Sequence, residues 1–253
     1  MHARKVRDGR DEFSIFIEGK RLAAEALCSG LTISNAFVSD VLNGEALLDQ
    51  LSSTNATVFE VAEKAFSSVA DTKNSQGVIL LAERPQHSLA DVEARIGTAD
   101  VPVVVYLDEV NNPANLGAII RTSEAAGAAA LLTSPASADA YSPKALRGSM
   151  GSAFRLPIVE GVTFADTLAF AKEAGLASVA AAGGGDVRYT DIDWTKPHLL
   201  MLGSEAHGLS DEKLAAMEKV AGIPLNSKVE SLNLGVAAGV ILFEAKRQCS
   251  ISG

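Results

Sequence analysis

The stretch NNPANLGAIIRTSEAAG (111–127) follows an apolar run and places two polar side chains near the start of an expected helix. Arg121 carries a planar fork of donors that suits a phosphate or a carboxylate. Asn115 either caps the helix or holds a ligand through its side-chain amide. Gly117 allows another group to approach the backbone closely, because glycine has no Cβ. Taken by itself, this stretch is typical of a capped helix with a surface arginine.

A second turn, LLMLGSEAHGLS (199–210), contains the small and polar residues of a ligand-binding loop. Gly203 and Gly208 leave backbone N–H and C=O groups open to the polar edges of a ligand. Glu205 either accepts hydrogen bonds from hydroxyl groups or caps the helix that follows. His207 is expected to be an exposed bystander, since a single histidine in a turn is rarely a general base. This turn is a second candidate for ligand binding.

A third stretch, AGIPLNSKVESLNLGVAAGVILFEAKR (221–247), combines a polar entry with a helix rich in small residues. Ser231 and Asn233 lie immediately before this helix. Gly235 and Gly239 are unusual inside it, because glycine is a poor helix former. We expect this face of the helix to lie close to another backbone, either of a neighbouring helix or of a threaded segment.

From residue 102 onward, apolar strands alternate with amphipathic helices, and the three stretches lie at the turns between them. This alternation predicts an α/β fold whose parallel sheet is covered by helices on both faces. In an open sheet of this kind, a ligand binds at the carboxyl ends of the strands. Strands are expected at VVVYLDEV, AALLTS, LPIVE, ASVAAA, HLLMLGS and GIPLN, and helices at LGAIIRTSEAAG, SPKALRGSMGS, FADTLAFAKEAG, DEKLAAMEKVA and LNLGVAAGVILFEAKRQ.

The residues before this sheet are expected to form a smaller α/β unit. FSIFIEG, NAFVSD and QGVILLAER have the patterns of strands, and ATVFEVAEKAF has that of a strand followed by a helix. The predicted division is a basic tail (1–11), a small domain (12–84), a polar connection (85–101) and a larger domain (102–253). The tail has four basic side chains and is either a solvated, mobile segment or an arm that contacts RNA.

The composition restricts the class of protein. With 253 residues, of which 47% are hydrophobic and 21% charged, the chain has the composition of a soluble globular protein. Its apolar runs fall far short of the roughly 18–20 residues that span a bilayer, and its start lacks a secretory pattern. Cys28 and Cys249 provide neither a disulfide framework nor metal-ligand spacing, so a cytoplasmic protein without a metal is expected. The net charge of −9 argues against extensive nucleic-acid-binding charge but leaves local contact with RNA open.

Together, the three stretches resemble the motifs of the SpoU (TrmH-like) family of RNA 2′-O-ribose methyltransferases, in the SPOUT superfamily. NLGAIIR (115–121) is similar to the first motif, Asn-x-Gly-x-x-x-Arg. GSEAHGL (203–209) is similar to the second, Gly-x-Glu-x-x-Gly, and IPLNSKVESLNLGVAAGVILFE (223–244) to the third. Each motif is a weak signal, but three in the right order make a strong one.

The resemblance extends to the start of the chain and implies a fold. FIEGKRLAAEAL and SQGVILLAE resemble the L30e-like RNA substrate-binding domain of many such enzymes. YSPKALRGSMGSAFRLPI (141–158) is similar to members that act on large-subunit ribosomal RNA. The family implies a parallel-sheet SPOUT domain with a C-terminal trefoil knot, which holds S-adenosylmethionine, and an active site near the interface of a homodimer. The implied substrate is 23S ribosomal RNA, with transfer RNA as the alternative.

The same resemblance implies two sets of site residues. The expected catalytic residues are Arg121, Asn115, Glu205, Ser231 and Asn233. The expected cofactor contacts are Leu202, Gly203, Ile223, Leu225, Leu232 and Ala181, with Ala182 close by. Arg121 is the group that assists deprotonation of the 2′-hydroxyl. Because a free arginine stays protonated, we interpret it as a phosphate clamp and electrostatic activator, with literal base catalysis left open.

Two departures from the family pattern and two other classes bear on this interpretation. Ala206 replaces a frequent glycine and Gly235 a frequent serine, which affects the expected shape of the pocket. A dinucleotide-binding enzyme with an ordinary doubly wound sheet predicts a Gly-x-Gly-x-x-Gly fingerprint, which the first turn lacks. A non-catalytic RNA-binding protein of the same fold predicts loss of the polar residues, and all five are present.

Overall fold

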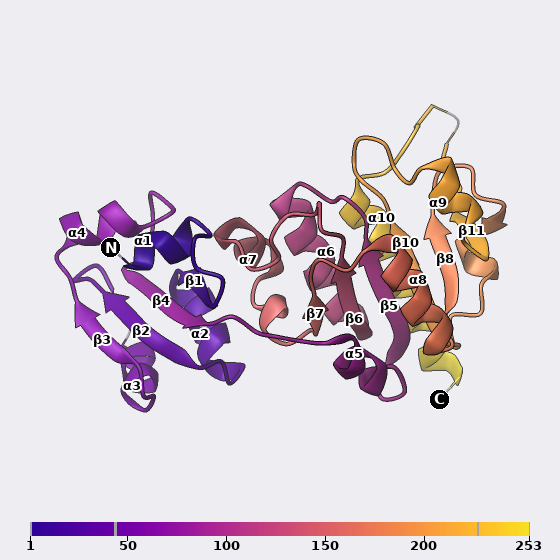
Figure 1. The fold of residues 1–253 in the computed structure, drawn as a ribbon. Helices are drawn as coiled ribbons and strands as arrows, with labels where there is room; N and C mark the ends of the chain where they lie inside the picture. The colour runs from indigo at the N-terminus through magenta and orange to yellow at the C-terminus, as the bar shows by residue number, and fades with distance from the viewer. Residues whose placement is uncertain (1, 43–44, 227, 253) are drawn as a thin grey trace.

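The structure is a computed structural model that describes residues 2–42, 45–226 and 228–252. Within these ranges the chain builds two sheets, each with its own helices, that lie beside one another (Figure 1). Met1 and Gly253, the first and last residues of the predicted domain ranges, lie outside the described residues. None of the described helices is long and apolar enough to cross a membrane.

The N-terminal unit has a four-stranded sheet in the order β1-β4-β2-β3. Strand β4 pairs antiparallel with β1 and β2, and β3 pairs parallel with β2 at the edge. The predicted strand and helix patterns of this unit are therefore confirmed, while helix α3 was not expected. The elements are β1 (Ser14–Glu18), α2 (Lys20–Cys28), β2 (Ile33–Val38), α3 (Glu45–Ser52), β3 (Thr57–Glu60), α4 (Glu63–Val69) and β4 (Val78–Glu83).

The first residues form a helix, α1 (His2–Arg7), and the prediction of a mobile tail is wrong. Ala3 and Val6 are buried in a small apolar cluster against the N-terminal sheet. Arg4 and Arg7 donate hydrogen bonds to backbone carbonyl groups at the end of α4. Such carbonyls have no partner within their own helix, so the two arginines satisfy them. Half of the basic side chains of this segment are thus engaged within the protein.

The second sheet has seven strands in the order β7-β6-β5-β10-β8-β11-β9, and every neighbouring pair is parallel. Strands β6 and β7 lie on one side of β5, and β10 and the later strands lie on the other. The carboxyl ends of β5 and β10 therefore face a crevice of the kind that binds ligands in open α/β sheets. The strands are β5 (Val101–Leu107), β6 (Ala128–Thr133), β7 (Ile158–Val159), β8 (Ala177–Ala181), β9 (Val187–Arg188), β10 (His198–Leu202) and β11 (Lys219–Gly222).

Helices cover both faces of this sheet, as the sequence predicts. Alternate residues of β5 point to opposite sides: Val104 and Tyr106 pack with α5 and α8, and Val103 and Val105 pack with α6 and α10. The helices are α5 (Leu89–Ile96), α6 (Pro113–Ala126), α7 (Pro143–Ser149), α8 (Phe164–Glu173), α9 (Asp211–Ala215) and α10 (Leu234–Ser252), with short 3₁₀ turns η1 (Ser152–Phe154) and η2 (Tyr189–Asp191).

One helix in this part was not predicted, and two predicted elements have other boundaries. The expected polar connection (85–101) contains α5, which begins with a capping box between Ser88 and Asp91 and buries its apolar side against the sheet. Helix α9 ends at Ala215, well before the predicted end at residue 221, because the following residues enter β11 beside β8. Strand β11 consequently lies ahead of the IPLN segment, which is irregular.

Three arginines join the two units across their boundary. Each one pairs with a carboxylate that lies on the other side of this boundary, which fixes the position of one sheet relative to the other. The pairs are Arg84 with Asp139 and Glu160, Arg147 with Asp71, and Arg155 with Glu25.

Candidate active site

The turn after β5 positions Asn115 but does not use it as a cap. Asn112 is the N-cap of α6, since its side chain accepts a hydrogen bond of 3.0 Å from the backbone N–H of Ala114. Pro113 follows at the first helical position, where its missing N–H costs nothing. Asn115 is therefore left in the first turn of α6 with its amide free for other partners, and the capping alternative for it is wrong.

Gly117 allows the close approach of a helix and not of a ligand. A Cβ at this position would lie 2.4 Å from the carbonyl oxygen of Ala145 and 2.9 Å from the Cα of Gly148, both in α7. Such distances are shorter than any ordinary contact, so α6 and α7 can touch here only because both positions are glycine. The group expected to approach the backbone at Gly117 is therefore helix α7.

The loop after β10 forms a tight hairpin that presents Glu205. Ser204 and Gly208 exchange two backbone hydrogen bonds of 3.2 and 2.9 Å. A Cβ at Gly203 would lie 2.3 Å from the carbonyl carbon of Gly208, so the hairpin closes only over glycine. Ser210, not Glu205, caps α9. The carboxylate of Glu205 is exposed at the tip of this hairpin.

Asn115 links the three stretches through a chain of hydrogen bonds. Its Nδ2 donates to Oε1 of Glu205 at 2.9 Å, and its Oδ1 accepts from Nδ2 of Asn233 at 3.3 Å. Oδ1 of Asn233 in turn accepts from the backbone N–H groups of Gly235 and Val236 at the start of α10. Both ends of each amide are used, so the orientation of the two asparagines is fixed. Three of the five predicted catalytic residues thus meet in one network.

Helix α10 runs beside α6, but Gly235 and Gly239 do not bring the two backbones into contact. A Cβ at Gly239 would lie 3.6 Å from Cγ2 of Thr122, which is an ordinary van der Waals distance. At Gly235 the nearest atom of α6, the Cβ of Ala118, would also lie at 3.6 Å. The predicted neighbour is therefore a helix, yet the contact with it is made by side chains.

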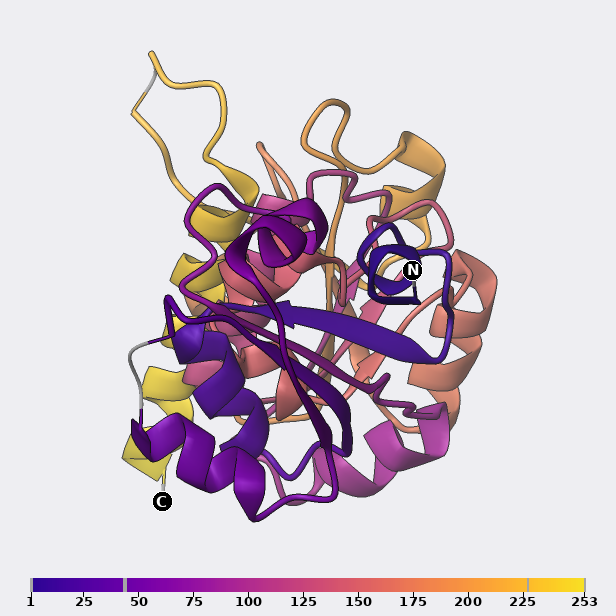
Figure 2. The same ribbon diagram turned by 90° about the vertical axis from the view of Figure 1, so that its left-hand side faces the viewer.

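A cavity of about 340 Å³ lies at the carboxyl ends of β8, β10 and β11, next to this network. It is bounded by the Gly203–Leu209 hairpin on one side and by the segment between β11 and α10 on the other. Figure 2 shows the latter segment reaching out from the body of the molecule. The cavity is lined by all the predicted cofactor residues, namely Leu202, Gly203, Ile223, Leu225, Leu232, Ala181 and Ala182, and also by Ser231.

Several lining residues were not predicted from the sequence. Leu209 and Leu214 line the cavity beside the hairpin, and Leu234 and Ala237 line it from the first turns of α10. The available signal was their place in the sequence: Leu209, Leu234 and Ala237 belong to the second and third stretches, and Leu214 lies in the helix after the second. Their apolar side chains complete a wall that suits the faces of a flat aromatic ring.

The backbone of this cavity has unused hydrogen-bonding groups. Ile223, Leu225 and Leu232 are half-buried, and their N–H groups have no hydrogen-bond partner among the residues that the structure describes. Backbone groups inside a protein are nearly always paired, so these are free for a bound molecule. Apolar side chains combined with unpaired backbone groups fit the adenine ring of an adenosyl cofactor, which needs packing on its faces and a few hydrogen bonds at its edge. In the same described ranges, no group of three or more histidine, cysteine or acidic residues could hold a metal ion.

Arg121 stands apart from the other polar residues. Its side chain is exposed and has no hydrogen bond or ion pair with any described residue. Because helical residues rise about 1.5 Å each, Arg121 lies roughly 9 Å along α6 from Asn115. The structure therefore brings Asn115, Glu205 and Asn233 together, puts Ser231 on the cavity wall, and leaves Arg121 as an unpaired cation one and a half turns further along the helix.

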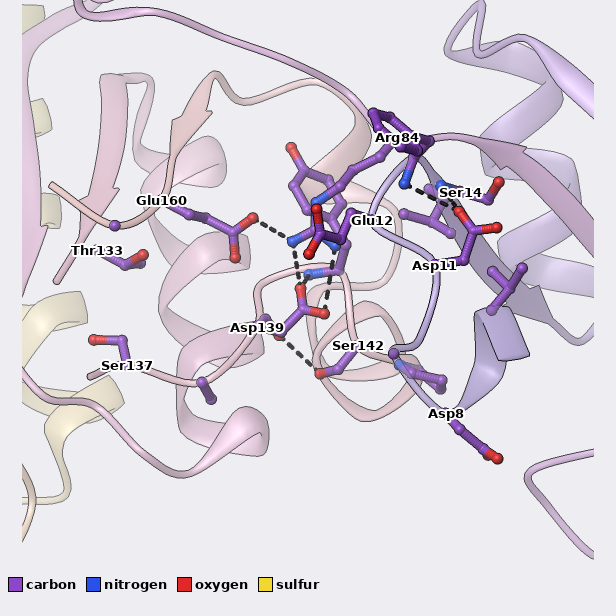
Figure 3. Close-up of a pocket in the computed structure, with 18 of the residues that line it drawn as sticks. Asp8, Asp11, Glu12, Ser14, Arg84, Thr133, Ser137, Asp139, Ser142 and Glu160 are labelled. Atoms are coloured by element: carbon purple, nitrogen blue, oxygen red, sulfur yellow. Dashed lines mark hydrogen bonds and ion pairs between the residues drawn. The ribbon is translucent and has the colours of Figure 1, made fainter. Parts of the chain in front are cut away.

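A larger cavity, of about 1020 Å³, lies elsewhere, between the N-terminal segment and the second sheet (Figure 3). Its central charges neutralise one another: Arg84 pairs with Asp139 at 2.7 Å and with Glu160, and its guanidinium lies 4.8 Å from the ring centre of Tyr141. Burial opposes the charge of Arg84, but the bonds and charges of Asp139 and Glu160 raise its pKa overall. Since none of the predicted site residues lines this cavity, we assign the active site to the smaller one.

Comparisons with known proteins identify similar sequences and structures. Residues 102–243 match the model of the SpoU rRNA Methylase family, and residues 1–80 match the MRM3-like substrate binding domain. The 23S rRNA (guanosine(2553)-2′-O)-methyltransferase RlmP of Bacillus subtilis is 29% identical, over 97% of this chain and 93% of its own length. The mitochondrial rRNA methyltransferase 3B of Danio rerio is also 29% identical, over 94% of this chain, which spans 66% of the longer relative. The AdoMet-bound rRNA methyltransferase from Sinorhizobium meliloti has a similar structure, with a TM-score of 0.83 and 32% identity over 97% of this chain and 92% of that one.

Proposed function

Because this chain belongs to the SpoU rRNA methylase family, we propose that it methylates the 2′-hydroxyl of a ribose in 23S ribosomal RNA. The chain is an RNA methyltransferase, and its cofactor is S-adenosylmethionine. The family match decides against the alternative of a dinucleotide-binding enzyme. The observation that carries the proposal is the cavity at the ends of β8, β10 and β11, which the second and third motif stretches line.

The reaction requires the protein mainly to align two groups, because the methyl donor is already activated. S-adenosylmethionine supplies a methyl group that its positive sulfur already activates. The 2′-hydroxyl oxygen must lose its proton as its new bond to carbon forms, and the hydroxyl must lie in line with the methyl group. Alignment of the reacting groups therefore supplies most of the rate, with assistance to deprotonation as a smaller part.

Each predicted residue has a role in this alignment. The unpaired N–H groups of Ile223, Leu225 and Leu232 bind the cofactor, and Leu202, Gly203 and Ala181 form the floor of its cavity. Asn115 and Glu205 orient the ribose, while Ser231 and Asn233 shape the entrance. Arg121 is a free cation, and we assign to it a phosphate of the RNA beside the reacting ribose. A permanent positive charge at that phosphate also favours the negative charge that develops on the 2′-oxygen.

In the proposed homodimer, Arg121 of one subunit lies near the active site of the other. The exposed side of α10 has an apolar stripe at Val236, Val240, Phe243 and Ile251, and the first and third of these are about half exposed. An exposed apolar stripe on a helix is typical of a surface that a partner covers. A second copy of the chain, related by a two-fold axis, covers this stripe in the proposed dimer. The unpaired Arg121 of one subunit then serves RNA bound at the other subunit's cofactor.

Three further properties are proposed for this chain. The insertion of β10 between β5 and β8, with α10 returning to pack on α6, is compatible with a trefoil knot in the C-terminal part. The division into the ranges 1–11, 12–84, 85–101 and 102–253, with an L30e-like RNA-binding domain first, is retained as a proposal. A cytoplasmic location stays a prediction.

Ribosomal RNA is favoured over transfer RNA as the substrate. The relatives from Bacillus subtilis and Danio rerio that match nearly the whole of this chain are named for ribosomal RNA. The match of the first 80 residues to a substrate-binding domain also supports an RNA that contacts both units of the molecule.

The decisive experiment is transfer of a labelled methyl group from S-adenosylmethionine to purified RNA. Total ribosomal RNA and total transfer RNA are incubated separately with the protein, and 2′-O-methyl positions are then mapped. Label at one ribose of 23S ribosomal RNA is the expected result. Label in transfer RNA alone would replace the substrate, and absence of cofactor binding at millimolar concentration in calorimetry would overturn the enzyme assignment.

A further inference from the structure

A part-buried ion pair joins the turn after β5, which leads to Asn115, to helix α9, which follows the hairpin with Glu205. Asp108 follows β5 immediately, and its side chain is only 6% exposed. Its Oδ2 lies 2.6 Å from Nζ of Lys213 in α9, and Oε1 of Glu109 lies 3.7 Å from the same nitrogen. Moving a carboxylate out of water is costly unless a cation compensates for it, so Asp108 depends on Lys213.

The backbone next to this pair has an uncommon conformation. Glu109 has a φ of +56°, in the left-handed region that residues with a Cβ rarely adopt. Its N–H donates a 2.8 Å hydrogen bond to Oγ of Ser134, and the N–H of Val110 donates one of 3.2 Å to Oγ of Ser137. The turn out of β5 is thus held in a strained form by surrounding side chains, which is a frequent property of functional sites.

The ion pair joins the two arms that carry the polar network. One arm is the short turn from Asp108 to Asn115. The other is the hairpin with Glu205, which starts after Leu202 and ends before α9. Asp108 binds both ends of this hairpin: its N–H donates to the carbonyl of Leu202 at 2.9 Å, and its carboxylate holds Lys213. A single residue therefore sets the separation between Asn115 and Glu205.

We propose that Lys213 is a positioning residue for methyl transfer, acting through Asp108 on the Asn115–Glu205 hydrogen bond. This inference rests on the proposed function, because it assigns these two side chains to the ribose. When Lys213 is absent, the buried carboxylate of Asp108 loses its cation, and the neighbouring residue Glu109, which also paired with Lys213, adds a second negative charge. The base of the hairpin then moves away from β5, and Glu205 leaves the amide of Asn115. The ribose loses its alignment, although the apolar walls of the cofactor cavity remain.

The test compares Lys213→Met with Lys213→Arg and with a control, Lys246→Met. Lys246 also makes one internal hydrogen bond, of 2.9 Å to the carbonyl of Ala125 at the far end of α6, so the control removes a lysine that has an internal contact away from the polar network. Single-turnover methyl transfer to ribosomal RNA is measured per cofactor-binding site, counted by titration, so that unfolded protein does not enter the rate. Lys213→Met is expected to slow transfer by about 10- to 100-fold, while cofactor affinity changes much less. Lys213→Arg should restore most of the rate, and Lys246→Met should leave it unchanged.

A double variant separates positioning from simple folding. Lys213→Met combined with Asp108→Asn removes both charges, so no unpaired carboxylate stays buried and thermal stability should recover. Transfer by the double variant should nevertheless stay slow, since the link between the arms is lost. Transfer at the wild-type rate by Lys213→Met or by the double variant overturns the inference. Failure of the wild-type protein to methylate RNA at all would instead overturn the proposed function.

Discussion

Asn115 donates a hydrogen bond of 2.9 Å to Glu205, which lies 90 residues further along the chain. The two side chains come from the turns after β5 and β10, and these strands are neighbours in the sheet. A carboxylate acceptor strengthens such a bond, and the other end of the amide is held by Asn233. The site therefore has a preorganised polar edge beside its apolar cavity.

Replacement of Arg121 by alanine should abolish methyl transfer and spare the cofactor. Arg121 has no partner among the described residues, so its loss should change neither folding nor the cavity. We expect transfer to fall at least about 100-fold, as for other losses of a group that stabilises developing charge. Calorimetry should show unchanged S-adenosylmethionine affinity. Arg95→Ala, which removes an exposed arginine of α5, is the matched control, and retained activity of Arg121→Ala would refute the phosphate role.

Replacement of Gly203 by alanine should prevent cofactor binding. The added Cβ would lie 2.3 Å from the backbone of Gly208, so the hairpin must open and the floor of the cavity must shift. Equilibrium titration should show a loss of S-adenosylmethionine affinity of at least about 10-fold, which corresponds to roughly 1.4 kcal/mol. Gly97→Ala is the control, because a Cβ there meets no atom within 4 Å. Equal affinity of the two variants would contradict the close hairpin.

Alanine at Gly117 and at Gly239 should change stability in opposite directions. At Gly117 the Cβ would collide with the carbonyl of Ala145 and force α7 away from α6, which should cost about 1–3 kcal/mol. At Gly239 the Cβ meets only Cγ2 of Thr122 at 3.6 Å, and alanine is the better helix former by about 1 kcal/mol. Urea unfolding of the two variants measures both values. A stabilised Gly117→Ala protein would rule out the tight crossing of α6 and α7.

Acidification should destabilise the protein through His198. This residue is buried under Trp194, and burial lowers its pKa below the ordinary value of 6.5. The unfolded chain therefore binds a proton at a pH where the folded chain does not. The contribution of neutral His198 to the free energy of unfolding is fully present above pH 6.5. It is lost as the pH falls from 6.5 through the pKa of the folded state. Urea unfolding between pH 7.5 and 5.5 should show a smaller loss in His198→Gln, and identical pH slopes would exclude His198 as the cause.

A charge on the exposed stripe of α10 should break the proposed homodimer. Phe243 is half exposed in the single chain, so Phe243→Glu should fold normally. Light scattering at micromolar concentration should give a dimer for the wild-type protein and a monomer for the variant. Methyl transfer should fall together with dimerisation, because Arg121 then has no neighbouring site. An active monomer would show that Arg121 acts within its own chain.

Much of the fold followed from local patterns in the sequence. The apolar strands around VPVVVYL and HLLMLGS and the helices between them were predicted, because a parallel sheet buried on both faces leaves no polar positions in its strands. The cofactor cavity is lined by every residue expected to contact the cofactor and by Ser231, although their roles stay predictions. Motif residues could be found because they lie at strand ends, where the sheet brings distant turns together.

Other features depend on tertiary contacts that the sequence does not state. Gly117 signals close approach but does not say that α7 is the neighbour. Asn112 and Asn115 are equally good caps in the sequence, and only the path of the chain decides between them. Helix α5 was overlooked because its segment is polar overall, although the Ser88-x-x-Asp91 capping signature was visible. The ion pair between Asp108 and Lys213 joins residues of opposite charge that no local pattern connects.

The arginine pairs between the two units have a consequence for how a target is selected. Arg84 holds carboxylates of two different loops of the second sheet, and Arg147 and Arg155 bind at separate points of the boundary. These three arginines hold the N-terminal sheet in one orientation relative to the seven-stranded sheet. An RNA that touches both units must therefore present two features at one fixed spacing. The fixed distance between the two units therefore selects the target: the folded shape of the RNA, as much as the identity of one nucleotide, decides which ribose reaches the cavity.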